Sequence, residues 1–184
     1  MPTLPDTELG RTLLAHARRA LERHFGLTDE PLADDARLAQ RGATFVTLKL
    51  YDALRGCIGS LRPQRALGED VAANAVAAAT RDTRFLPVSA DELNDIRIEV
   101  SLLSEPQFLE FTDEADLLRQ LRPGIDGLIL SGGCRSATFL PQVWNQLPEP
   151  REFVAALKRK AGLAPDHPTG NLLAATYTVR KWCE

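Results

Sequence analysis

The stretch from Arg55 to Ser60, which reads Arg-Gly-Cys-Ile-Gly-Ser, holds the residues best suited to chemistry. Alternate side chains of a strand point to the same face, so Arg55, Cys57 and Gly59 would share one face and Gly56 the other. A cation close to a thiol favours the thiolate and lowers a thiol pKa from ~8.5 toward neutrality. The stretch therefore predicts a reactive or ligand-binding Cys57 in a cleft with a floor of glycine backbone, with Arg55 beside the sulfur.

A structural interpretation of the same stretch stands beside the chemical one. A cysteine outside a disulfide is among the most buried residue types, so Cys57 could be a small apolar side chain packed in a strand. Glycine weakens a strand and usually marks a bulge or a place where another group comes close. Gly56 and Gly59 could serve that purpose alone. Both interpretations remain open at the level of the sequence.

Four further acidic or basic residues could belong to a site. Asp82 and Arg84 follow a predicted helix and could bind an anionic ligand, or could hold the helix end through surface ion pairs worth roughly 0–1 kcal/mol. Glu99 lies in an alternating polar and apolar stretch typical of a half-buried strand. If its face meets the hairpin, Glu99 could act as a general base or pair with Arg55, and if it faces solvent it does neither. Asp126, at a strand entrance, is typical of a turn.

No other pattern of residues predicts a catalytic or metal site. The three histidines do not converge in the sequence, and the three cysteines form no CxxC or Cys/His spacing, so we predict no metal site and no disulfide framework. No phosphate-binding glycine loop, nucleophilic triad or other cofactor signature is present. No pattern indicates an oligomeric state. The residues concerned are His16, His24, His167, Cys57, Cys134 and Cys183.

Length and composition predict one globular domain. The chain has 184 residues, 44% of them hydrophobic and 26% charged, which excludes a disordered chain. With 22 basic and 25 acidic side chains the net charge is −3, which argues against nucleic-acid binding because that needs clustered Lys and Arg. No apolar run approaches the ~20 residues of a membrane helix. The amino terminus shows no secretion signal, and we expect a soluble cytoplasmic protein.

A hairpin and a helix must position the thiol. Residues 44–50 are rich in β-branched and aromatic side chains and predict a strand. Residues 51–53 can turn the chain into a second strand over 54–61, which carries Cys57. Residues 67–80 place small apolar side chains at helical spacing, so this alanine-rich helix can approach a sheet closely.

Other elements flank this hairpin and helix. An amphipathic helix comes first, with Asp6 as its cap and Gly26 as its end. The remaining predicted elements are a strand at 97–102, a short helix from a Thr112 cap to Leu121, strands at 128–130 and 136–140 around a turn at 132–133, a helix from Pro150 to Gly162, and a strand at 172–179.

The order hairpin, helix, strand occurs twice. The strands centre near residues 47, 58 and 99, and again near 129, 138 and 176. The pattern predicts an α+β fold of two related β-rich halves, about 42–121 and 122–181, with mostly antiparallel strands and flanking helices. Coincidence is the alternative, because this order of elements is common.

Residues 54–59, Leu-Arg-Gly-Cys-Ile-Gly, resemble the signature hexapeptide (LRGCIG motif) of the AMMECR-one domain family. That family includes protein A of the AmmeMemoRadiSam system. The resemblance covers nearly the whole chain, through residues 45–48, 82–87, 98–101, 124–130, 137–144 and 160–163. The chain departs from the family pattern at Ser136, Asn145 and Pro168.

The resemblance implies a compact α+β fold with a cleft near the hexapeptide, and it brings no established activity. It implies a Memo-like protein and a radical S-adenosylmethionine enzyme as partners, and any radical chemistry would be theirs, since this chain has no CxxxCxxC motif. We expect Cys57 as the reactive centre, Arg55 tuning its thiol and Glu99 transferring protons. The alternative is a non-catalytic adaptor that docks onto those partners. The expected lining residues are Gly56, Gly59, Asp82, Arg84, Asp126, Thr138 and Gln142.

Overall fold

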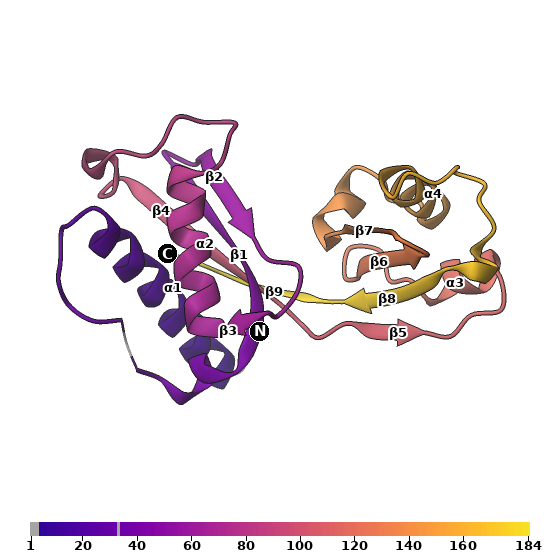
Figure 1. Ribbon diagram of the computed structural model, residues 1–184, viewed down its shortest axis with the longest axis horizontal. Coiled ribbons are helices and arrows are strands. Elements are labelled where there is room, and N and C mark those ends of the chain that lie inside the picture. The colour runs from indigo at the N-terminus through magenta and orange to yellow at the C-terminus, as the bar shows by residue number, and fades with distance from the viewer. Residues whose placement is uncertain (1–3, 33) are drawn as a thin grey trace. The chain divides into compact units, whose positions relative to one another are not determined.

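A computed structural model describes residues 4–32 and 34–184 (Figure 1). Helices and two antiparallel sheets make up the chain, so the predicted α+β class is confirmed. Within the described residues, no helix is both long and apolar enough to cross a bilayer. The elements are α1 (Leu4–His24), β1 (Arg41–Leu50), β2 (Ala53–Gly59), β3 (Arg65–Ala66), α2 (Leu67–Thr80), β4 (Ile96–Leu103), β5 (Gln107–Leu109), α3 (Glu114–Gln120), β6 (Gly127–Gly132), β7 (Arg135–Phe139), α4 (Pro150–Lys160), β8 (Leu173–Tyr177) and β9 (Val179–Cys183).

The chain divides into two compact units. The first unit runs to Leu103 and includes Arg180–Glu184, and the second unit is Ser104–Val179. The division therefore falls before β5, whereas the predicted halves met at residues 121 and 122. Each unit holds a hairpin whose first strand pairs with a later strand, in the orders β2-β1-β4 and β7-β6-β8. An ancestral duplication remains a prediction.

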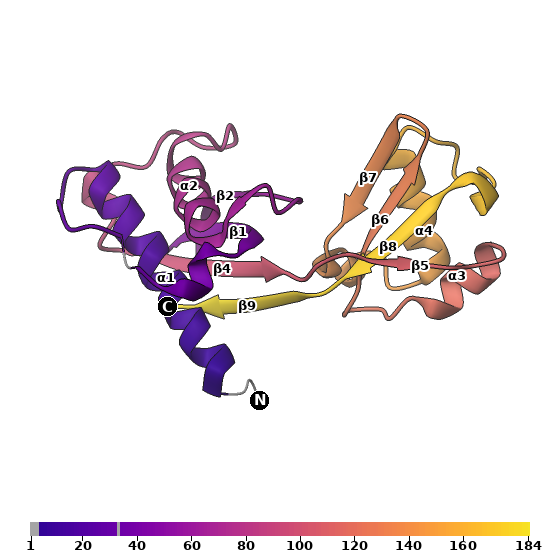
Figure 2. The same cartoon turned by 60° about the horizontal axis from the view of Figure 1, so that its bottom comes forward.

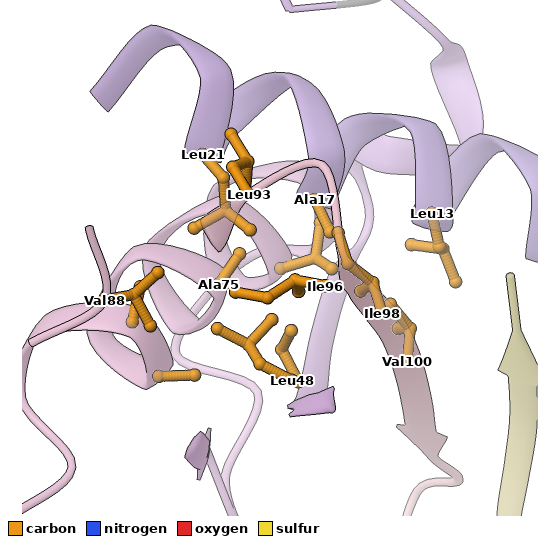
Figure 3. Close-up of a cluster of buried hydrophobic side chains, with 14 of the residues drawn as sticks. Leu13, Ala17, Leu21, Leu48, Ala75, Val88, Leu93, Ile96, Ile98 and Val100 are labelled. Carbon is orange, nitrogen blue, oxygen red and sulfur yellow. The ribbon is translucent and has the colours of Figure 1, made fainter. Parts of the chain in front are cut away.

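The sheet of the first unit has the order β2-β1-β4-β9, with the short β3 also paired to β1. Figure 2 shows β4 and β9 side by side. Alternate residues of β1 and β4, such as Val46 and Ile98, are fully buried against α1 and α2. Figure 3 shows side chains of this core, which come from α1 (Leu13, Ala17 and Leu21), β1 (Leu48) and β4 (Ile96, Ile98 and Val100). Burying each leucine contributes about 1.5–3 kcal/mol.

Helix α2 lies unusually close to strand β2. The second half of its buried face includes three alanines, Ala75, Ala78 and Ala79. A Cβ added at Gly56 would lie 2.1 Å from the backbone oxygen of Ala78, so only glycine fits at that position of β2. The close approach expected of an alanine-rich helix is therefore present, and Gly56 makes it possible.

The second unit has a sheet of the order β5-β8-β6-β7. Its core contains Leu128 and Leu130 of β6 and Phe153 of α4. Trp144, in a short turn of helix before α4, stacks on Phe153 with ring centroids 3.7 Å apart, and its Nε1 donates to the Asp126 carbonyl oxygen at 2.7 Å.

Some predicted boundaries differ from the structure. Asp113 and not Thr112 caps α3, because the Asp113 carboxylate accepts the Asp116 amide at 2.8 Å while Thr112 donates its own amide to the Asp116 side chain. The turn after β6 is Gly133–Cys134, one residue later than predicted. The last predicted strand is two strands, β8 and β9, which belong to different sheets.

Candidate functional site

The hairpin that carries Cys57 has a β-bulge at Arg55. The register pairs Leu48 with Gly56 and Lys49 with Leu54, so Arg55 is the extra residue of β2. A bulge bends the strand and re-aims the side chain of the extra residue. The simple alternation that placed Arg55 beside Cys57 therefore fails at this point.

Arg55 is bound to the segment that follows α2. Its Nε donates to Glu92 Oε1 at 2.8 Å and its Nη2 to Oε2 at 3.1 Å. Its Nη1 donates to the Leu86 carbonyl oxygen at 2.7 Å, and its Nη2 also reaches that of Pro87 at 3.2 Å. The Arg55 guanidinium lowers the pKa of Glu92 to about 2, with help from the Ser89 amide. The prediction that Arg55 tunes the thiol is corrected, because Arg55 anchors this segment.

Cys57 is partly exposed and is held from two sides. Its amide donates to Asp82 Oδ2 at 2.8 Å, and its Sγ accepts the hydroxyl of Thr47 at 3.2 Å. Thr47 is the residue directly opposite Cys57 in β1. Because β2 lies at the sheet edge, Asp82 satisfies an outward amide that no strand pairs with.

Asp82 joins the backbone of Cys57 to the guanidinium of Arg84. Arg84 Nε donates to Oδ1 at 2.9 Å and Nη2 donates to Oδ2 at 2.6 Å, the oxygen that also accepts the Cys57 amide. These hydrogen bonds hold the pKa of the buried Asp82 far below its usual range, those from Arg84 contributing most. The pKa of Arg84 is raised, chiefly by Asp82 and to a smaller extent by the charge of Cys57. Arg84 is therefore a cation that Asp82 ties to the backbone of Cys57, the kind of neighbour that the sequence analysis expected Arg55 to be.

Glu99 lies across the sheet from Cys57, on the same face, but its partners are two lysines and not Arg55. Thr47 is opposite both Cys57 and Glu99 in the strand register, so all three share one face. Glu99 Oε2 accepts Lys49 Nζ and Glu99 Oε1 accepts Lys181 Nζ, both at 2.7 Å. Burial raises the pKa of Glu99, but the hydrogen bonds from the two lysines outweigh it and hold the pKa below its usual value.

This arrangement makes Glu99 a poor general base. Its carboxylate is charged and each oxygen is bound to an ammonium group, which lowers its affinity for a proton. The Cys183 thiol also donates to Glu99 Oε2, at 3.5 Å. The pairing of Glu99 with Arg55, one of the two roles considered for it, is corrected: β1 lies between them, and the bulge turns Arg55 toward Glu92.

The two glycines of the hexapeptide are required by packing. Gly56 is buried and faces α2, opposite to Cys57 as the alternation predicted, and the part of its backbone in a cleft floor stays a prediction. A Cβ at Gly59 would lie 2.2 Å from the ring of Phe45, the residue opposite it in β1. Both positions are places where another group comes close, as the structural interpretation expected.

The remaining predicted lining residues lie in the second unit. Asp126 is buried and accepts the Arg122 amide at 2.8 Å and Arg122 Nη2 at 2.6 Å, which fixes the turn before β6. Thr138 donates its hydroxyl to the Leu128 carbonyl oxygen at 2.9 Å. Gln142 is exposed. Asp126 and Thr138 thus make contacts that stabilise their own unit.

Metal ligands do not gather in the described part of the chain, where no three His, Cys, Asp or Glu side chains lie close enough to hold an ion. Cys57, Cys134 and Cys183 are free thiols, and the last two are exposed.

Comparison with known proteins identifies the family. The AMMECR1 family model matches residues 14–182, nearly the whole chain. The chain belongs to the AMMECR1 domain family. The predicted family is thereby confirmed, and Cys57, Asp82, Arg84 and Glu99 all lie within the matched part of the AMMECR1 domain.

Relatives of this AMMECR1 domain occur in archaea. A protein of Methanothermobacter thermautotrophicus is 42% identical, covering 85% of this chain and 84% of that protein. A protein of Thermococcus onnurineus is 40% identical, covering 86% and 82%. The crystal structure of an uncharacterized protein from Pyrococcus horikoshii is similar with a TM-score of 0.80 at 33% identity, covering 96% of this chain and 92% of that chain. These comparisons establish the family and the fold and assign no activity.

Proposed function

We propose that this AMMECR1 domain binds or modifies a small molecule, or a group carried by a protein, at the strand edge around Cys57. The Cys57 thiol is the reactive group of this site. The observation that carries the proposal is the partly exposed sulfur beside an Arg84–Asp82 pair that is fixed to its own backbone amide.

The polar contacts at Cys57 exceed what packing needs. A buried carboxylate such as Asp82 is costly unless it is paired and hydrogen-bonded, and here it is both. A cysteine that only filled space would be sealed among apolar side chains, whereas this sulfur accepts a hydroxyl from Thr47. These contacts support a thiol held in a defined position at the surface.

The chemistry available to a thiol here is nucleophilic. Sγ gives its electron pair to an electrophilic carbon of the bound group and forms an S–C bond. The S–H proton goes to water, and a leaving group, where there is one, departs with its bonding electrons. Glu99 is placed outside this step, because both of its oxygens are bound to lysines.

Alkylation of the folded protein tests the proposal. Trypsin does not cleave between Arg62 and Pro63, so it releases Cys57 in peptide 56–65, separate from Cys134 and Cys183, and mass spectrometry follows each thiol by itself. We expect iodoacetamide to modify Cys57 in the native protein, with the exposed Cys134 as the positive control. A Cys57 that stays unmodified until guanidinium unfolds the chain, while Cys134 reacts, would refute the proposal.

We further propose that the protein works in the cytoplasm, in a pathway with a Memo-like protein and a radical S-adenosylmethionine enzyme. The support is the family's inclusion of protein A of the AmmeMemoRadiSam system, together with three unpaired cysteines, which suit a reducing compartment. Co-purification of a tagged chain with these two proteins from its own cells tests the association. Recovery of neither protein after cross-linking would contradict it.

A non-catalytic adaptor is the second candidate function, and one observation favours it. Three exposed apolar side chains lie in or next to the hexapeptide segment: Tyr51 at 79%, Leu54 at 41% and Leu86 at 83% exposure. An adaptor docking through them predicts that Leu86→Asp abolishes co-purification, whereas Cys57→Ser preserves both co-purification and the output of the pathway. Loss of that output in Cys57→Ser, with co-purification intact, would favour the thiol site.

A further inference from the structure

We infer that the group presented to Cys57 carries a negative charge, as a carboxylate or a phosphate, and that the outer edge of the Arg84 guanidinium binds it. This inference rests on the proposed function of Cys57 and adds the chemical class of the substrate.

Arg84 has hydrogen-bond donors that no residue of the described chain uses. A guanidinium offers five N–H groups, and Arg84 uses its Nε and Nη2 on the carboxylate of Asp82. Its Nη1 has no acceptor among the described residues, and the side chain is 56% exposed. The Arg84 Cζ lies over the ring of Phe85, 5.5 Å from the centroid.

The guanidinium is also held in place before any ligand arrives. Two parallel hydrogen bonds to Asp82 fix its plane, and Asp82 is fixed by the Cys57 amide. Bidentate recognition of carboxylate and phosphate is the geometry for which arginine is best suited. An anionic group bound to this guanidinium would therefore be held at little entropic cost, with Asp82 joining the guanidinium to the backbone amide of Cys57.

The charge on this face of the first unit favours an anion. The chain has a net charge of −3, yet the groups paired around Cys57 and Glu99 leave one positive charge in excess. These groups are Arg84, Lys49 and Lys181 on the positive side and Asp82 and Glu99 on the negative side.

Two neighbouring arginines are not available for this role. Arg55 is committed to Glu92 and to two backbone carbonyls. Arg81 lines a different surface groove, with Ala20 and Ala77 among its neighbours. Arg81 therefore offers a matched control, because it removes the same charge three residues from Arg84.

The experiment compares anionic iodoacetate with neutral iodoacetamide at Cys57. Both reagents attack through the same thiolate, so the ratio of their rate constants cancels any change in thiolate population. We expect Arg84→Gln to lower this ratio about fivefold, the factor that corresponds to the interaction of about 1 kcal/mol between unit charges 4 Å apart in water. Arg84→Lys should keep part of the ratio, and Arg81→Gln should leave it unchanged.

Salt dependence gives a second reading that needs no variant. Two anions react faster when salt screens their repulsion, as expected for iodoacetate with the thiolate of free N-acetylcysteinamide. At Cys57 the attraction to Arg84 should reverse this trend, so that added NaCl slows iodoacetate. Because this measurement uses the wild type alone, it decides the question even if Arg84→Gln unfolds. Unfolding of that variant would be detected as a faster reaction of Cys57 with iodoacetamide.

The outcomes separate the two proposals. A Cys57 that is inert to both reagents refutes the proposed function itself. A Cys57 that reacts with both, with a ratio equal in the wild type and Arg84→Gln and with the salt trend of the free thiol, overturns this inference alone. Protection of Cys57 by inorganic phosphate but not by acetate, at constant ionic strength, would assign the charge to a phosphate, and the reverse would assign it to a carboxylate.

Discussion

Gly56→Ala should destabilise the first unit by about 3 kcal/mol. The added Cβ would lie 2.1 Å from the backbone oxygen of Ala78 and 3.0 Å from its carbonyl carbon. Ala78 lies in the last turn of α2, and its backbone oxygen cannot rotate away as a side chain can, so this end of the helix must shift and loosen its packing on the sheet. Overpacking of this kind costs about 1–3 kcal/mol, and the rigid neighbour places Gly56 at the upper end.

Gly59→Ala is the matched control in the same strand. Its Cβ would meet the ring of Phe45 at 2.2 Å, but Phe45 is a side chain on a partly exposed face and can turn aside. Replacing glycine also removes freedom from the unfolded chain, which returns about 0.4–1 kcal/mol at a compatible site. We therefore expect Gly59→Ala to cost less than about 1 kcal/mol.

Urea unfolding followed by far-ultraviolet circular dichroism measures both variants. We expect an unchanged m-value, a clearly lower midpoint for Gly56→Ala and a melting temperature lower by about 10 °C. A Gly56→Ala protein within 0.5 kcal/mol of the wild type would refute the close approach of α2 to β2. The hexapeptide would then need another explanation for its first glycine.

Three further results are expected. Burial lowers the pKa of His16, whose Nδ1 has no hydrogen-bond partner, so the unfolded state binds the proton more readily and stability should fall as the pH drops below 6.5; His16→Leu should flatten that part of a pH series of urea midpoints. Arg55 lowers the pKa of Glu92 from 4.5 to about 2, so this contribution is complete above pH 4.5 and is lost toward pH 2; Glu92→Gln should remove that dependence. Thr47→Val removes the hydroxyl that donates to Cys57 Sγ and should slow its alkylation about fivefold, from the loss of one hydrogen bond of about 1 kcal/mol.

The elements around the site could be predicted because their signals are local. The hairpin over residues 44–61 follows from β-branched residues on either side of a turn, and Tyr51 and Asp52 indeed adopt the positive φ of such a turn. The alternation of polar and apolar residues predicted which side chains of β4 are buried. The alanine content of residues 67–80 predicted that α2 approaches the sheet closely. The same local reasoning expected another group near each glycine, although it could not name Ala78 or Phe45.

The partners of the site could not be predicted, because they depend on register and on distant segments. A bulge at Arg55 is a property of two paired strands, and one extra residue is enough to turn its side chain toward Glu92. Glu99 meets Lys181 only because β9, from the far end of the chain, joins this sheet. Arg84 carries a visible signal in the sequence, an arginine two residues after Asp82, but only the fold brings that pair to the amide of Cys57.

The contacts of the hexapeptide separate residues whose type the fold requires from Cys57, whose type it leaves open. Gly56 and Gly59 are set by the space that Ala78 and Phe45 occupy, and Arg55 is set by its anchor on Glu92. Cys57 differs, because Asp82 binds its backbone amide, which any residue other than proline would supply. Packing therefore explains the neighbours of the thiol without explaining the thiol itself. The proposal that Cys57 acts on a group outside the chain therefore accounts for a residue type that packing leaves unexplained.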